Sequence, residues 1–192
     1  MRLSRLAGPI LLLLGCSACV TPPADALPRY GWYVRPQGDL VLADFEANTG
    51  NHTQTVSPGW GLTVGGVTDQ GYDVAWAMEG TFEWSYHPMD ESADANYKRY
   101  MFGGRYFWNM DSKFRPSVTF GGAYHTIQFP DVDHEFRTKG YGVYGGIGVD
   151  FQLTERWALG IDCKLHLLYA DNENQGDIVL WSVVGLSLTY YF

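Results

Sequence analysis

The sequence has few cysteines, few basic residues and no apolar run of about 18 residues that would cross a membrane as a helix. Cys163 is the only cysteine beyond residue 19, so the main part of the chain has neither a disulfide nor a paired-cysteine zinc site. The chain has 13 lysines and arginines against 21 aspartates and glutamates, a formal net charge of −8. This acidic balance argues against a nucleic-acid partner.

The first residues have the anatomy of a secretory signal. A basic start is followed by the apolar stretch 6–14, which is too short to span a bilayer. The stretch ends in Leu13-Leu14-Gly15-Cys16, which resembles the lipobox of bacterial lipoproteins. This resemblance implies that residues 1–15 are a signal peptide and that Cys16 carries lipid after its removal.

Two alternatives to processing at Cys16 are open. Cleavage after Ala26 would use the small residues of Ala24-Asp25-Ala26, and Cys19 could be lipidated instead. Residues 16–29 contain three prolines and are expected to form an extended tether without a fold of its own. The remaining residues 30–192 are expected to form one domain.

From residue 30 onward, apolar and polar side chains alternate. The clearest stretch is 72–86, where Val74, Trp76 and Met78 fall on one face of a strand and Asp73 and Glu79 on the other. A soluble sheet can show the same alternation. The number, length and ending of such segments favour a barrel whose apolar side faces lipid.

Eight alternating segments predict eight strands. The expected strands span residues 31–45, 59–67, 72–86, 98–109, 114–128, 139–152, 157–169 and 177–192. Pro36 lies inside the first of them and removes one donor from its hydrogen-bond ladder. Cys163 lies between Ile161 and Leu165 on an apolar face, so it is expected to face lipid.

The connections between the expected strands alternate in length. Longer polar connections, mostly acidic, are expected at 46–58, 87–97, 129–138 and 170–176, and tight turns at 68–71, 110–113 and 153–156. Short turns on one rim and long loops on the other are typical of outer-membrane barrels, whose short turns are periplasmic. Both ends of the barrel segment are therefore expected on the periplasmic side.

The strand lengths fit a bilayer. The twelve steps from Trp157 to Tyr169 rise roughly 31 Å at about 3.4 Å per residue and a tilt near 40°, comparable to a hydrocarbon core of about 30 Å. Within lipid every backbone polar group needs a protein partner, so the last strand must pair with the first. The prediction is an all-β fold: an eight-stranded antiparallel up-and-down transmembrane β-barrel.

The chain ends on alternate apolar residues, namely Leu186, Leu188, Tyr190 and Phe192. This ending resembles the signal by which outer-membrane barrels are recognised for assembly. With eight strands, it makes residues 30–192 similar to the small OmpA-like and OmpX-like barrels. The resemblance implies a location in the bacterial outer membrane, outer-membrane lipids and lipopolysaccharide as partners, and recognition by the barrel assembly machinery through Phe192. It leaves the extracellular partner open.

An eight-stranded barrel is just wide enough to be filled by side chains. We therefore expect a packed polar interior instead of a channel, with both signs of charge present because a lone buried charge is unfavourable. The expected network comprises Asp73, Glu79, Glu83, Arg99, Arg105, Arg115, Asp150, Asp162 and Lys164. His125 and His166 are expected to hydrogen-bond within it.

The preferred hypothesis is a structural or surface-interaction protein that contributes to envelope integrity, without enzymatic activity, cofactor or metal ion. A lipid A-modifying enzyme is one alternative, with Ser85, His87 and Asp90 as weak candidates for its catalytic groups. A narrow pore is the second, and a soluble lipocalin-like binder, with its apolar side inside, is the third. The acidic stretch 131–135 lacks the spacing of an EF-hand and is interpreted as a solvated loop.

Overall fold

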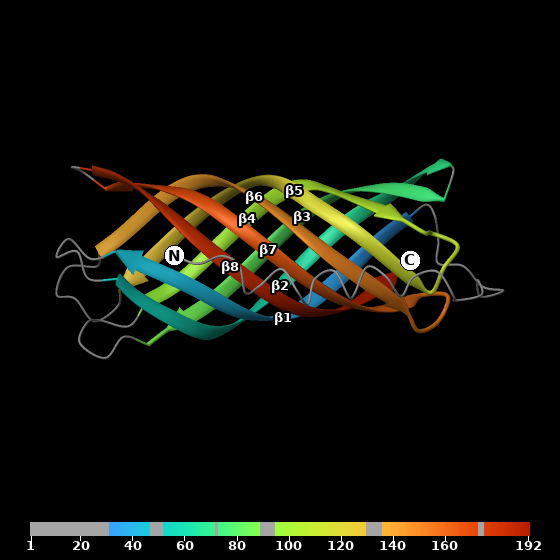
Figure 1. Cartoon of the computed structure of the whole chain (residues 1–192), viewed down its shortest axis with the longest axis horizontal. Helices are drawn as coiled ribbons and strands as arrows, with labels where there is room; N and C mark the ends of the chain where they lie inside the picture. The colour runs from blue at the N-terminus through green and yellow to red at the C-terminus, as the bar shows by residue number, and fades with distance from the viewer. Residues whose placement is uncertain (1–30, 47–51, 72, 89–94, 130–135, 173–174) are drawn as a thin grey trace, which may run out of the picture.

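The computed structural model describes residues 31–46, 52–71, 73–88, 95–129, 136–172 and 175–192. These residues form eight antiparallel strands in one closed barrel, in which every strand pairs with its neighbours in sequence and β8 pairs with β1. Figure 1 shows the strands running obliquely around the barrel. The strands are β1 (Gly31–Glu46), β2 (His52–Gly71), β3 (Val74–His87), β4 (Ala95–Trp108), β5 (Phe114–Phe129), β6 (Phe136–Gln152), β7 (Trp157–Asn172) and β8 (Gln175–Tyr191).

The eight-stranded antiparallel barrel predicted from the alternation is confirmed. None of the described residues belongs to a helix that is long and apolar enough to cross a membrane. The signal peptide 1–15, Cys16, the tether 16–29 and the acidic stretch 131–135 lie outside the described residues.

The large apolar side chains point away from the barrel axis. Trp32, Phe102 and Tyr141 are 66%, 63% and 70% exposed, whereas Arg35 and Arg99 are completely buried. Successive side chains of a strand point to opposite faces, so the two sets lie on opposite sides of the wall. The lipocalin-like alternative is therefore wrong, because it requires the apolar side within.

The register of the eight strands sets the tilt of the barrel. Starting at Tyr33 and stepping from each residue to its partner in the next strand, the path returns to β1 at Ala43. The displacement is 43 − 33 = 10 residues. A closed barrel needs such a stagger, and it tilts the strands by roughly 35–45° against the axis.

The strands on one rim extend further than predicted. The β1–β2 ladder continues to the pair Glu46 and His52, and the β7–β8 ladder to Asn172 and Gln175. The long connections expected at 46–58 and 170–176 are therefore wrong, because most of these residues belong to strands. The alternation signal is lost beyond the bilayer, where both faces of a strand can be polar.

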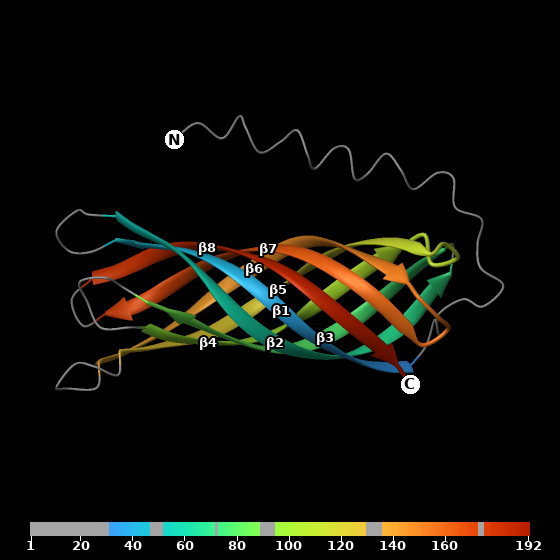
Figure 2. The ribbon, with the colours of Figure 1, turned by 90° about the horizontal axis from the view of Figure 1, so that it is seen from below.

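The opposite rim carries the start of β1, the end of β8 and three short connections (Figure 2). Asp73 and Asn109 have positive φ angles of 62° and 58° there, which aspartate and asparagine tolerate better than most residues. The Asp73 carboxylate accepts a hydrogen bond from the Asp111 amide at 2.8 Å. Short turns identify this rim as periplasmic.

Pro36 interrupts one ladder without breaking β1. Its backbone pairs with Leu62 of β2. On the β8 side, neither Arg35 nor Pro36 is paired, so the ladder has a gap between the pairs Val34–Tyr190 and Gln37–Ser187. A proline has no amide hydrogen to donate, which accounts for the gap on this side.

Candidate functional site

The barrel interior carries a balanced set of charges. Within the described strands it holds five basic and five acidic side chains, so the net interior charge is 5 − 5 = 0. These residues are Arg35, Arg99, Arg105, Arg115, Lys164, Asp39, Glu79, Glu83, Asp150 and Asp162. All of them are buried, which places this polar core out of contact with both lipid and bulk water.

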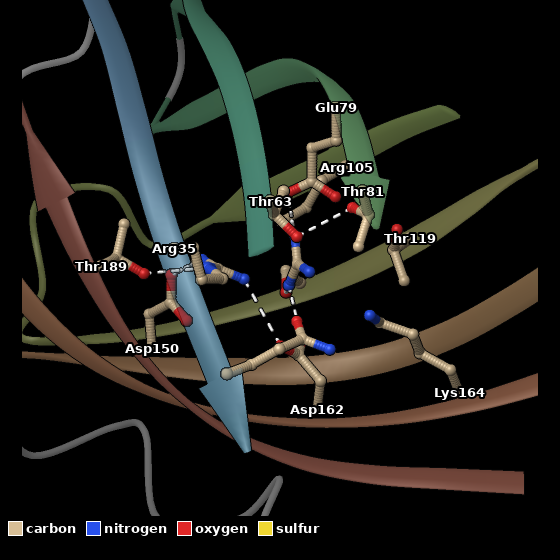
Figure 3. Close-up of polar contacts among 12 residues, drawn as sticks. Arg35, Thr63, Glu79, Thr81, Arg105, Thr119, Asp150, Asp162, Lys164 and Thr189 are labelled. Carbon is tan, nitrogen blue, oxygen red and sulfur yellow. Dashed lines mark hydrogen bonds and ion pairs between the residues drawn. The ribbon is translucent and has the colours of Figure 1, made fainter. Parts of the chain in front are cut away.

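The first cluster joins five strands around Arg35 and Arg105 (Figure 3). The Arg105 guanidinium contacts Glu79 at 2.7 Å and Asp162 at 2.6 Å. Arg35 contacts Asp150 at 2.6 Å and Asp162 at 3.4 Å. Asp162 therefore links both arginines, and β1, β3, β4, β6 and β7 are tied together across the interior.

Neutral groups complete this first cluster. The Tyr33 hydroxyl donates a hydrogen bond to Glu79, and the Arg35 Nε donates to the Thr189 hydroxyl at 2.8 Å. The Ser117 hydroxyl accepts from Arg105 at 3.1 Å. Buried charges are stable only when their remaining hydrogen-bonding capacity is satisfied, and these neutral groups supply part of that capacity.

The second cluster surrounds Glu83, nearer the extracellular end. Glu83 contacts Lys164 at 2.7 Å and Arg99 at 2.9 Å, and Gln37 donates to it at 2.9 Å. Gln37 also donates to Asp39 at 3.0 Å. The Arg99 guanidinium lies over the Tyr97 ring, 5.1 Å from its centroid. One carboxylate thus compensates two cations that come from β4 and β7.

Two predicted members of the network lie apart from these clusters. Arg115 is buried near the periplasmic rim, where it donates to Gln152 at 2.9 Å and to the Ser112 carbonyl at 3.1 Å. Asp73 lies in the turn before β3, so its assignment to the interior network is wrong. Alternation along 72–86 predicts an inward position for Asp73, but its positive φ of 62° interrupts the extended backbone just before β3.

The interior histidines differ from the expectation as well. His166 stacks on Tyr144 with a centroid distance of 5.7 Å, and among the described groups neither of its ring nitrogens has a hydrogen-bond partner. His125 packs beside Tyr97 at 5.8 Å. The predicted hydrogen bonding of His166 within the network is therefore wrong; its ring packs against an aromatic neighbour instead.

Apolar clusters lie on both sides of the charged core. The periplasmic cluster consists of Tyr33, Val67, Ala75, Ala77, Phe107, Met110, Ala158 and Tyr191. The extracellular cluster consists of Val41, Ala95, Tyr97, Met101, Ala123, Ile127, Tyr144, Leu168 and Val183. An ion moving along the axis would meet buried apolar side chains at both ends.

Glycines on the inner wall make room for the carboxylates. A Cβ at Gly185 would lie 2.6 Å from an Asp39 carboxylate oxygen. A Cβ at Gly160 would lie 2.6 Å from an Asp150 oxygen and 2.5 Å from the Ser187 hydroxyl. Real Cβ atoms do not approach this closely, so these two glycines are needed for the polar core to fit.

The network predicted from the sequence includes no residue of β1, although four of them lie in the interior: Tyr33, Arg35, Gln37 and Asp39. All four lie on β1 at alternate positions and are buried. The sequence contains the signal, because the large apolar residues Trp32, Val34 and Leu40 fall on one face of the predicted strand 31–45 and the intervening residues must then fall on the other. Arg35 is the most consequential of the four, since it bridges two carboxylates.

A closed antiparallel barrel with an apolar outer wall and a charged, side-chain-filled interior defines a small transmembrane β-barrel. The family described as "Outer membrane protein beta-barrel domain" matches residues 10–192, and the chain belongs to this family. Its location is therefore the bacterial outer membrane. No curated protein sequence matches the chain significantly.

Solved structures of similar shape share little sequence with the chain. Neisserial surface protein A is 13% identical, with a TM-score of 0.67 over 84% of this chain and 97% of that one. Ail, the attachment invasion locus protein of Yersinia pestis, was solved in complex with the heparin analogue sucrose octasulfate. It is 14% identical, with a TM-score of 0.58 over 86% of this chain and 100% of that one. At these identities the likeness concerns the fold alone.

Proposed function

We propose that the protein is a structural and surface-interaction component of the outer membrane whose interior conducts no ions. The observation that supports this proposal is the charge-balanced core, in which Arg35, Arg105 and Asp162 cross the barrel axis with ion-pair distances of 2.6–3.4 Å. Side chains from opposite walls meet there, so the interior is occupied. A pore would need a continuous hydrated path in their place.

The surface role is supported by the form of the extracellular rim. The β1–β2 and β7–β8 ladders extend toward the connections on that rim as far as His52 and Gln175, which gives these connections a rigid base. Two proteins of similar fold carry names that refer to the surface and to attachment. We infer a comparable display role for this chain, in which the ligand is not specified.

Planar-bilayer recording tests the closed interior. The folded full-length protein is expected to give no steady conductance steps under conditions in which a large porin gives them, and protein unfolded by heat serves as the matched control. Channels of defined size that depend on the folded protein would contradict the proposal. If such channels are seen, replacing Glu83 by glutamine tests whether the ions pass the charged core, because the charge selectivity of the channel would then change.

Envelope integrity is tested in cells. Deleting the gene is expected to increase the entry of a large antibiotic that an intact outer membrane excludes, and expression of the wild-type chain is expected to reverse this. Unchanged permeability in the deletion strain would contradict a structural role.

A lipid-modifying enzyme is the second candidate, because the Ser85 hydroxyl and the His87 Nε2 are 2.9 Å apart. Such a pair is typical of a nucleophile and its base. Both side chains are completely buried in the interior, however, so an acyl chain on the outer wall has no access to them. Asp90, the third expected group, lies outside the described residues.

Mass spectrometry of lipid A tests this candidate. Cells with wild-type protein, with Ser85→Ala and without the protein are expected to contain lipid A of one acyl composition. A change that requires Ser85 would establish the enzyme and overturn the structural proposal.

A further inference from the structure

The part of the outer wall whose side chains the structure describes contains almost no charge. At the outward positions of the strands, among side chains that the structure describes, only Lys98 and Lys139 are charged. The backbone of Lys139 also pairs with that of Asp171 on β7. Both lysines carry a positive charge, although the chain as a whole has a formal net charge of −8. A lysine is unfavourable deep in the hydrocarbon but costs little near the interface, where an anionic headgroup can contact it.

The two lysines are neighbours on the wall. Lys98 of β4 and Lys139 of β6 are both register partners of Thr126 on the intervening β5. Neighbouring strands lie about 4.8 Å apart, so the two Cα atoms are about 10 Å apart. Thr126 faces outward between them, yet it is only 9% exposed. Because the two Cα atoms are this close, the ammonium groups at the ends of the flexible Lys98 and Lys139 side chains can contact one ligand.

The depth of the pair corresponds to the outer boundary of the hydrocarbon. Ten residues separate Lys98 from Trp108 at the periplasmic end of β4, and twelve separate Lys139 from Phe151 on β6. With about 3.4 Å per residue and a tilt near 40°, these spans rise roughly 26 Å and 31 Å. An apolar band of about 25–30 Å ends at this height.

A row of aromatic rings lies directly below the lysines. Tyr100, Tyr124 and Tyr141 are two residues closer to the membrane midplane on β4, β5 and β6. The ring centroids of Tyr100 and Tyr124 are 6.4 Å apart, and those of Tyr124 and Tyr141 are 5.3 Å apart. Tyrosines at a membrane interface present an apolar ring to the acyl chains and a hydroxyl to the headgroups. The patch thus combines an interfacial platform with two cations above it.

We propose that Lys98 and Lys139 bind a phosphate group of lipid A, the phosphorylated glycolipid anchor of lipopolysaccharide in the outer leaflet. The ammonium groups supply charge-assisted hydrogen bonds to the phosphate oxygens, and Tyr100, Tyr124 and Tyr141 support the sugar and the upper acyl chains. This inference goes beyond the proposed function and depends on neither a closed interior nor an extracellular partner. It requires only that the barrel resides in the outer membrane.

The test measures lipid binding to the folded full-length protein in detergent micelles, by native mass spectrometry or tryptophan fluorescence. The probes are phosphorylated lipid A, its dephosphorylated form and phosphatidylglycerol. The variants are K98Q, K139Q and K98Q/K139Q. K113Q is the matched control, because Lys113 is exposed in the β4–β5 turn on the periplasmic rim.

Each single variant is expected to weaken binding of phosphorylated lipid A about fivefold and the double variant about 30-fold, from roughly 1 kcal/mol for each basic residue near an anionic surface. K113Q is expected to bind like wild type. Wild-type protein is expected to bind the dephosphorylated form about as weakly as the double variant binds the phosphorylated form. The single variants keep the test available if the double variant does not fold.

Three results would overturn the proposal. One is equal binding of phosphorylated and dephosphorylated lipid A by wild-type protein. Another is a loss in K113Q as large as that in the double variant. The third is phosphatidylglycerol binding as tight as that of lipid A, with the same loss in the double variant, which would reduce the patch to a general attraction for anionic lipid.

Discussion

Replacing Glu83 by glutamine removes the carboxylate that both Lys164 and Arg99 contact, at 2.7 Å and 2.9 Å. The substitution keeps the shape of the side chain but leaves two buried cations without this compensating charge. Breaking a buried ion pair in this way destabilises a protein by about 3–5 kcal/mol. An ion pair in a water-filled interior would instead be worth about 1 kcal/mol or less. The size of the effect therefore separates a packed core from a hydrated channel.

The assay is reversible urea unfolding in lipid vesicles, followed by tryptophan fluorescence. Glu83→Gln is expected to lower the free energy of unfolding by about 3–5 kcal/mol. Glu155→Gln is the matched control, because Glu155 is exposed in the β6–β7 turn, and is expected to change it by about 0.5 kcal/mol or less. Adding Lys164→Met to Glu83→Gln removes one of the uncompensated cations, so part of the loss is expected to be recovered.

The reasoning is refuted if Glu83→Gln and Glu155→Gln have equal, small effects. It is also refuted if the losses caused by Glu83→Gln alone and by Lys164→Met alone simply add in the double variant, because the two side chains would then not be coupled.

Three further changes test other parts of the structure. Leu168→Ala opens a cavity in the extracellular apolar cluster and is expected to lower the free energy of unfolding by about 2–5 kcal/mol. Leu167 faces lipid, so Leu167→Ala is expected to lower it less. Equal losses in the same urea assay would contradict the inward placement of Leu168. Gly185→Ala pushes a methyl group against an interior carboxylate and is expected to lower the midpoint of heat-modifiability on detergent gels, whereas Gly38→Ala has no heavy atom within 4 Å of the new Cβ and is expected to leave it unchanged. Removing Phe192 is expected to reduce the amount of folded barrel in cells more than the stability of protein refolded in vitro, and equal effects would contradict its recognition during assembly.

The course of the strands across the bilayer could be predicted because one rule, inside against outside, governs each residue there. On β7 every residue from Trp157 to Tyr169 obeys that rule, and the predicted start of the strand agrees with the structure. Beyond the bilayer the rule no longer applies. For this reason the sequence predicts loops at the outer parts of β2 and β8, where the ladders continue.

The partners within the interior could be predicted only as a group. Alternation shows that Arg105 and Asp162 face inward, but their contact at 2.6 Å depends on the stagger between β4 and β7, which no local pattern encodes. The turn at Asp73 illustrates the opposite limit. The spacing of Asp73 predicts that it faces the barrel interior, but its positive φ angle places it in a turn.

Side-chain orientation along one strand tests the central claim most directly. Nitroxide labels are placed one at a time on residues 157–169 of β7, in a full-length chain whose other cysteines are replaced by serine, and the protein is folded into lipid. Collisions with dissolved oxygen, which concentrates in hydrocarbon, are expected to be most frequent at odd positions, including Ile161, Cys163 and Leu165. Maxima at even positions such as Asp162 and Lys164, or no period of two, would contradict an apolar outer wall around an ionic interior.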